Sequence, residues 1–358
     1  MISPKVYLSM RGNSALSVGL LLLAAALLAM PYVSTVLILH LVYFMLGVLF
    51  DIITMGCQIM TRRVHGDKSG IWIGTNLAVL GGASALATLI CYVDTSLFQQ
   101  FAMTSATSLS AAVYLGIALP APEKFEGFLE ATPKFLSGSA AAVEELISRS
   151  SSMKGKCSLF FQKYSVEIHI SGMLFSLSGG MATAGAYLYT YVEYTDIIPE
   201  SQEPLLMVDF WVSSAVGIVA GLFDQRTCTL PSLYRHSTVA FLTAGAVGSA
   251  ILVFRDSVVV LWVFIGLFGL ACGPMMGYTF ELNNRISVPS ATGMSIVTFG
   301  LSFGSVAVPY ATSFVLDYTG SAAVFIVINV LSRLVPYPLM LNAKRITESR
   351  TRRGREGV

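Results

Sequence analysis

The chain has 358 residues, of which 54% are hydrophobic and only 12% are Asp, Glu, Lys or Arg. A soluble domain carries about 25% charged residues, so this chain has too few charged side chains to cover a surface that faces water. These figures exclude a soluble globular domain, a disordered chain and a nucleic-acid-binding protein. They favour an all-α membrane protein, because a helix is the only open-chain structure that satisfies its backbone hydrogen bonds in lipid.

Ten apolar runs are long enough to cross a bilayer, which takes about 20 residues each. In chain order these predicted spans cover 14–34, 36–60, 70–92, 97–119, 166–192, 206–225, 236–254, 257–281, 291–316 and 321–342. If the N-terminus lies in the cytosol, alternation places nearly all of the 22 Lys and Arg residues on the cytosolic side. Positive charge favours cytosolic loops, so both termini are predicted to be cytosolic.

A charged stretch divides the spans into a group of four and a group of six. Residues 120–165 are rich in Glu, Lys and Ser, which is typical of a linker in the cytosol. The chain is therefore predicted to contain a partial N-terminal helix bundle (1–119), the linker (120–165), a C-terminal six-helix bundle (166–342) and a basic cytosolic tail (343–358).

The four-plus-six count suggests a chain that begins late. Major facilitator transporters have two six-helix halves joined by such a linker, so the first two helices of such a protein would be missing here. We expect Met1 to be an internal methionine of an incomplete gene model, or the start of a shortened isoform. A ten-helix protein of another architecture is the alternative.

Polar residues recur along the second span. Gly47, Asp51, Thr54 and Gln58 are spaced by four, three and four residues, which places them on one face of a helix. Polar side chains inside a membrane span are functional candidates. This face is predicted to contact a substrate or a cation in a central cavity. The alternative is a packing stripe, in which Asp51 bonds to a neighbouring helix.

The fifth span carries a second stripe of hydroxyl and aromatic side chains. Ser176, Thr183, Tyr187 and Thr190 lie on one side of the predicted helix. Hydroxyls can exchange hydrogen bonds with a sugar, and aromatic rings can stack on its apolar faces. The same residue types also join membrane helices in proteins of any function, so both interpretations remain open.

No motif of a soluble enzyme is present. The chain has no phosphate-binding loop, no dinucleotide-binding glycine motif, no zinc-protease motif and no serine-hydrolase elbow. Its four histidines do not form clusters with cysteines or carboxylates. The sequence therefore predicts a protein that is not an enzyme, with no metal site and no cofactor.

Several runs resemble one transporter family. Residues 47–58 read GVLFDIITMGCQ, 64–70 read VHGDKSG, 187–191 read YLYTY and 210–217 read FWVSSAVG. From the second span onward the chain resembles the sodium-dependent glucose transporter 1 branch of the major facilitator superfamily. That family has the run G-x-x-x-G-x-x-D-T-G-x-N followed by a W-G-x-K-S-G loop. The first span here then matches the family's third helix.

The resemblance implies a plasma-membrane transporter that moves a small polar solute, a hexose such as glucose, by alternating access with sodium or proton coupling. Its partners would be the sugar and the lipid bilayer; no nucleic acid is expected, and the oligomeric state stays open. The implied substrate-binding residues are Asp51, Thr54, Gln58, Thr183, Tyr187, Tyr191 and Trp211. Asp224 and Arg226, in the run GLFDQR, resemble the superfamily's cytosolic gate motif G-x-x-x-D-R.

Departures from the family weaken the sodium prediction. Thr54 and Gln58 stand where the family has Asp and Asn, and Met181 and Ile218 replace its Glu and Arg. The cavity thereby loses nearly all its ionisable groups, although a sodium site needs oxygen ligands. Asp51, one turn from Thr54, is the candidate replacement. The alternative function is a transporter-derived membrane scaffold or regulator that no longer transports.

Overall fold

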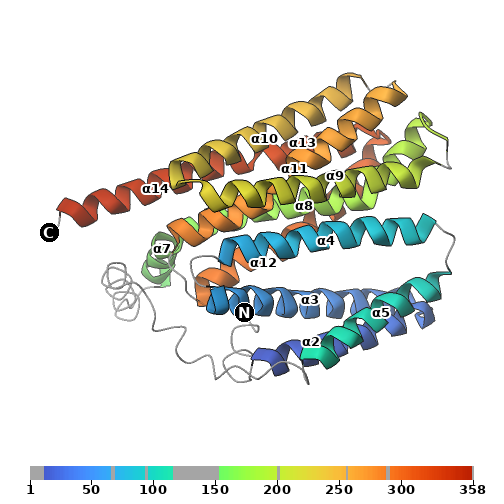
Figure 1. Cartoon of the computed structure of the whole chain (residues 1–358), viewed down its shortest axis with the longest axis horizontal. Helices are drawn as coiled ribbons and strands as arrows, with labels where there is room; N and C mark the ends of the chain where they lie inside the picture. The colour runs from blue at the N-terminus through green and yellow to red at the C-terminus, as the bar shows by residue number, and fades with distance from the viewer. Residues whose placement is uncertain are drawn as a thin grey trace. The chain divides into compact units, whose positions relative to one another are not determined.

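The structure is a computed structural model that describes residues 12–65, 69–92, 96–115, 153–199, 202–254, 257–287 and 291–356. Over these ranges it is built of helices and contains no strand, as predicted (Figure 1). In chain order the elements are α2 (Gly12–Ala29), the 3-10 turn η1 (Met30–Tyr32), α3 (Val36–His65), α4 (Ser69–Tyr92), α5 (Leu97–Val113), α7 (Met153–Lys163), α8 (Ser165–Thr195), α9 (Glu203–Thr227), α10 (Leu230–Val253), α11 (Val258–Ile286), α12 (Ala291–Thr319), α13 (Ala323–Leu334) and α14 (Pro336–Glu356).

Each predicted span coincides with a helix. Among the described residues, five helices are long and apolar enough to cross a membrane: Glu203–Thr227, Leu230–Val253, Val258–Ile286, Thr292–Thr319 and Ala323–Arg350. The chain is an integral, multi-pass membrane protein. The last predicted span, 321–342, is divided, because α13 ends at Leu334 and α14 begins at Pro336. Proline has no N–H to continue a helix but is well tolerated in a first turn.

Local sequence sets several helix ends. Ser96 begins α5 with a capping box, in which its side chain accepts from the Gln99 backbone and the Gln99 side chain accepts from the Ser96 backbone. This exchange satisfies two backbone donors that the first turn leaves open. Gly320 follows the end of α12 with a φ of 61°, a left-handed conformation that glycine adopts without steric cost.

The chain forms two compact units. Unit 1 comprises residues 1–69 and 89–131, and unit 2 comprises residues 70–88 and 132–358, so most of α4 belongs to unit 2. In unit 1, hydroxyl groups join α2 to α5: Ser17 Oγ donates to the Ala112 carbonyl at 2.8 Å, and Ser105 Oγ donates to the Ala24 carbonyl at 2.7 Å. Residues 116–152, most of the predicted linker, lie outside the described residues.

Glycines bring helix backbones into contact in unit 2. A Cβ atom at Gly300 or Gly304 of α12 would overlap a backbone carbonyl oxygen of α8, at Ser171 or Phe175 respectively. Hydroxyls of α8 reinforce this contact, since Ser171 Oγ donates to the Ile296 carbonyl at 2.7 Å and Ser178 Oγ to the Leu301 carbonyl at 2.6 Å. Small residues and interhelical hydrogen bonds hold membrane helices together where no hydrophobic effect is available.

Candidate functional site

Three predicted substrate residues lie on α3 of unit 1. Asp51, Thr54 and Gln58 follow one another at helical spacing, so the helix itself is as predicted. Thr54 is half-buried. Gln58 is buried, and its Oε1 atom has no hydrogen-bond partner. For Asp51 the structure describes the backbone but not the side chain.

The other four predicted residues lie in unit 2. Thr183 of α8 is fully buried, and its Oγ1 atom has no hydrogen-bond partner. Tyr187 packs against the core of the unit, and Tyr191 lies 5.5 Å from the Phe325 ring of α13, measured between ring centroids. Trp211 of α9 lies against a different side of α8, where its Cζ2 atom is 3.1 Å from the position of a Cβ at Gly185. The structure therefore does not gather these four side chains into one pocket.

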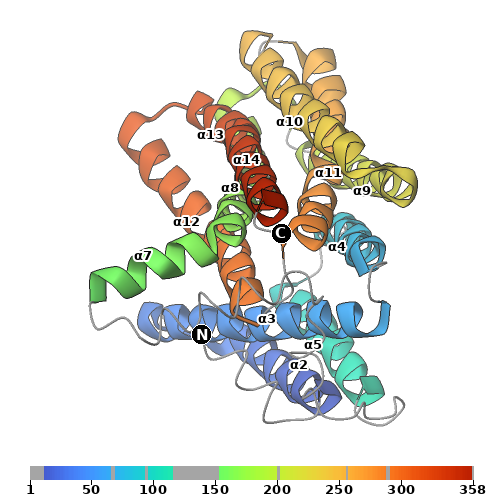
Figure 2. The same cartoon turned by 90° about the vertical axis from the view of Figure 1, so that its left-hand side faces the viewer.

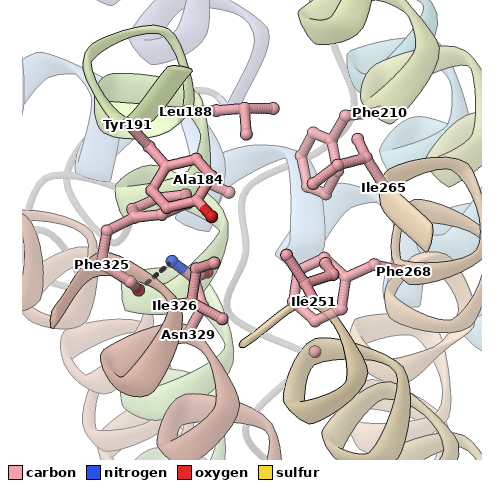
Figure 3. Close-up of a pocket in the computed structure, with 11 residues that line it drawn as sticks. Ala184, Leu188, Tyr191, Phe210, Ile251, Ile265, Phe268, Phe325, Ile326 and Asn329 are labelled. Atoms are coloured by element: carbon pink, nitrogen blue, oxygen red, sulfur yellow. Dashed lines mark hydrogen bonds between the residues drawn. The ribbon is translucent and has the colours of Figure 1, made fainter. Parts of the chain in front are cut away.

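Tyr191 borders a small internal cavity, shown in Figure 3 with Tyr191 and Phe325 on one side and Phe210 and Phe268 on the other. Its volume is about 20 Å³, which is room for about one water molecule. Asn329 also lines it and donates from Nδ2 to the Phe325 carbonyl at 3.0 Å. A hexose does not fit in this cavity.

Three polar residues of unit 2, Asp224, His236 and Tyr278, form a group that we call the Asp224 cluster. His236 Nδ1 lies 2.6 Å from Asp224 Oδ2, and the Tyr278 hydroxyl donates to the same oxygen at 2.9 Å. Since a carboxylate only accepts, Nδ1 must carry the hydrogen. The three residues come from α9, α10 and α11, so one carboxylate oxygen joins three helices with charge-assisted hydrogen bonds.

An open cavity of about 360 Å³ borders the Asp224 cluster. The cluster forms its polar end, and Val239, Thr243, Ala271 and Pro274 line much of the remainder. The side chains of His236 and Asp224 are 29% and 30% exposed, so this pair is only partly covered by the helices of unit 2.

Arg285, near the end of α11, supports the turn between α9 and α10. Its Nε donates to Glu281 at 2.6 Å, and its Nη1 donates to the Cys228 carbonyl at 2.8 Å. Burial raises the pKa of the Cys228 thiol above its ordinary value, and the nearby Arg285 guanidinium offsets only part of that rise. Arg226, the second predicted gate residue, is exposed and lies 5.6 Å from the Phe223 ring. Of the two predicted gate residues, only Asp224 belongs to the cluster.

Sequence reasoning missed the partners of Asp224. His236 is 12 positions away and Tyr278 is 54 positions away, so neither shares a motif with it. The one available signal was that Asp224 and His236 flank a short helix-to-helix turn. Among the residues that the structure describes, no group of three or more His, Cys, Asp or Glu side chains could hold a metal ion.

Arg333 of α13 is an arginine in the interior of unit 2. It is fully buried, donates from Nη1 to the Leu177 carbonyl of α8 at 2.9 Å, and lies 5.6 Å from the Phe268 ring. Its Nε and Nη2 atoms have no hydrogen-bond partner. A Cβ at Gly180 would lie 3.1 Å from its Cζ atom, so glycine at this position leaves the room that the guanidinium occupies. A charge inside a membrane span is costly.

Comparisons with known proteins show no family. No protein-family model matches the chain, and no curated protein matches it. The chain is similar to the crystal structure of a bacterial homologue of the iron transporter ferroportin in its outward-facing state. That similarity has 17% sequence identity and a TM-score of 0.44, and it covers 94% of this chain and 100% of the other. Membership of the glucose-transporter family stays a prediction.

Proposed function

We propose that this protein is a transporter of the major facilitator type that moves a small polar solute, a hexose, across the plasma membrane by alternating access. Both termini would face the cytosol. The observation that carries the proposal is the buried Oγ1 atom of Thr183 in unit 2, which has no hydrogen-bond partner. In unit 1, taken by itself, Gln58 Oε1 is a second buried polar atom without a partner. Both belong to residues that the sequence pattern selects as substrate contacts. Buried polar atoms are nearly always hydrogen-bonded, and sugar hydroxyls would supply the absent bonds.

The test is uptake of labelled glucose into vesicles that contain the purified chain. Uptake should exceed that of protein-free vesicles and fall when unlabelled glucose competes. Gln58→Leu and Thr183→Val should each lower the uptake rate at low glucose about fivefold, since one hydrogen bond contributes about 1 kcal/mol. Thr107→Val is the control, because Thr107 is exposed and bonds only within its own helix.

Uptake equal to that of protein-free vesicles, across a panel of hexoses, would leave the scaffold or regulator as the function. A sodium gradient applied to the same vesicles tests the coupling ion. We expect Asp51→Asn to remove any sodium dependence, because sodium prefers sites that include a carboxylate oxygen. A proton gradient provides the alternative driving force.

The Asp224 cluster is the proposed support of the cytosolic gate. By bonding to α10 and α11, Asp224 fixes the end of α9 and so positions Arg226, two residues further along. We expect Asp224→Asn to lower the initial uptake rate between 10- and 100-fold, because a hydrogen bond to a charged group contributes about 1.5–3 kcal/mol. The elution profile of the purified variant shows whether the fold persists. An unchanged rate in a folded variant would exclude this role.

A further inference from the structure

Basic side chains gather where α7 and α14 leave the helices of unit 2. Figure 1 shows the C-terminal part of α14 extending beyond its neighbours at the end where α7 lies, and Figure 2 shows α7 running sideways from the start of α8. We call this group the basic collar. It comprises Lys163 of α7 and Lys344, Arg345, Arg350 and Arg352 of α14.

The first half of α14 belongs to the membrane bundle, and its second half does not. Met340 and Ala343 are each 1% exposed, whereas Arg345, Arg350 and Arg352 are exposed. The helix therefore passes from a packed apolar environment to a polar one within about three turns. Arg345 and Arg350 therefore lie at the polar end of the apolar helix Ala323–Arg350, and Arg352 directly follows it. Basic residues at the end of a span are expected at the membrane surface.

Arg350 joins the two helices of the collar. Its Nη2 atom donates to the Gln162 carbonyl at 2.6 Å, to the Lys163 carbonyl at 3.1 Å and to Ser165 Oγ at 2.8 Å. It thus places a positive charge at the C-terminal end of α7, where the helix dipole favours a cation. Through this contact α7 and α14 form one surface.

α7 has the composition of a helix that lies in the membrane interface. It carries three lysines, no acidic residue and the pair Phe160 and Phe161. Phe160 packs against Tyr164, with ring centroids 4.9 Å apart, whereas Phe161 is 59% exposed. An exposed phenylalanine among lysines is typical of interfacial helices, which insert the ring among lipid chains and keep the charges at the headgroups.

We propose that the basic collar binds the phosphate groups of anionic phospholipids in the adjacent leaflet. In the predicted topology this is the cytosolic leaflet, where anionic lipids are concentrated and attract clusters of Lys and Arg next to a span. One guanidinium group can donate two parallel hydrogen bonds to the oxygens of one phosphate group. Phe161 contacts the acyl chains of the lipid. Among the described side chains of α14, Glu348 alone opposes this charge, and it lies 3.9 Å from Lys344. The proposal does not depend on which solute is transported.

The test uses the full chain in nanodiscs that contain phosphatidylcholine and phosphatidylserine, and native mass spectrometry counts the lipids that stay bound after extraction. The wild-type chain should retain phosphatidylserine preferentially. Replacing Arg345 and Arg352 together with glutamine should weaken that preference about 30-fold, given two basic residues at the membrane surface. The control replaces Arg345 and Arg352 together with lysine, which keeps both positive charges and should retain most of the preference.

Two further measurements complete the test. One asks whether the bound phosphate belongs to a lipid or is free, and the other uses the wild-type chain and so does not depend on the folding of a variant. Inorganic phosphate at high concentration should not displace the lipid, and displacement would assign the site to free phosphate instead. In the wild-type chain, rising salt should reduce the preference, because screening weakens exposed charge interactions. Equal retention of the two lipids, or equal losses in the collar and control variants, would overturn the proposal.

Discussion

Gly304→Ala is expected to destabilise unit 2 severely, although alanine is a better helix former than glycine. The added Cβ would overlap the Phe175 carbonyl oxygen and lie 2.6 Å from the Phe175 Cα atom. These are backbone atoms of α8, so relief requires the two helices to separate rather than one side chain to rotate. Overpacking of this kind costs about 3 kcal/mol or more, against a total stability of about 5–15 kcal/mol.

Gly82→Ala is the matched control for this change. Gly82 also lies within a helix, but no atom lies within 4 Å of its hypothetical Cβ. There alanine should be neutral or stabilise the helix by up to about 1 kcal/mol. The unfolding temperature, measured by heating followed by size-exclusion chromatography, should fall for Gly304→Ala and stay the same or rise for Gly82→Ala. A Gly304→Ala protein that unfolds at the wild-type temperature would contradict the backbone contact between α8 and α12.

Two substitutions at Arg333 should have opposite consequences. Arg333→Ala removes a fully buried side chain and leaves the Leu177 carbonyl without its donor, and we expect a loss of about 3–5 kcal/mol. Arg333→Met fills most of the same volume without burying a charge whose Nε and Nη2 atoms lack partners. Replacement of buried charges by apolar side chains is often neutral or stabilising by about 1–4 kcal/mol.

Urea or thermal unfolding of the two variants in the same detergent compares these outcomes. Arg235→Met, at an exposed position of α10, controls for the loss of one positive charge. If Arg333→Met is as unstable as Arg333→Ala, the charge itself is needed, and the unpaired donors must bind another group.

The helices could be predicted from the sequence because lipid leaves the backbone only one choice. An apolar run of sufficient length therefore fixes a helix without knowledge of its neighbours, and each of the ten runs overlaps helix in the described residues, the last of them divided between α13 and α14. The break at Pro336 was visible in the sequence, but the apolar run continues across it. Helix α7 lies in the predicted linker and was not predicted, because only 11 residues form it and they are not uniformly apolar.

The contacts between helices could not be predicted in the same way. The spacing of Thr183, Tyr187 and Tyr191 places them on one side of α8, but whether that side faces a cavity or α13 depends on packing, and Tyr191 faces Phe325. Arg333 falls within the predicted span 321–342, yet its burial depends on the space that Gly180 leaves 153 positions earlier. The sequence predicts which residues share one face of a helix, but it does not predict which residues of another helix they contact.

Counterflow tests alternating access most directly. Vesicles that contain the purified chain are loaded with unlabelled glucose and diluted into a trace of labelled glucose. A carrier that exposes one site alternately to each side should accumulate labelled glucose transiently above its outside concentration, because the excess unlabelled sugar inside occupies the inward-facing site and keeps labelled sugar from leaving. Entry that does not respond to the sugar inside, or that equals entry into protein-free vesicles, would contradict the transporter.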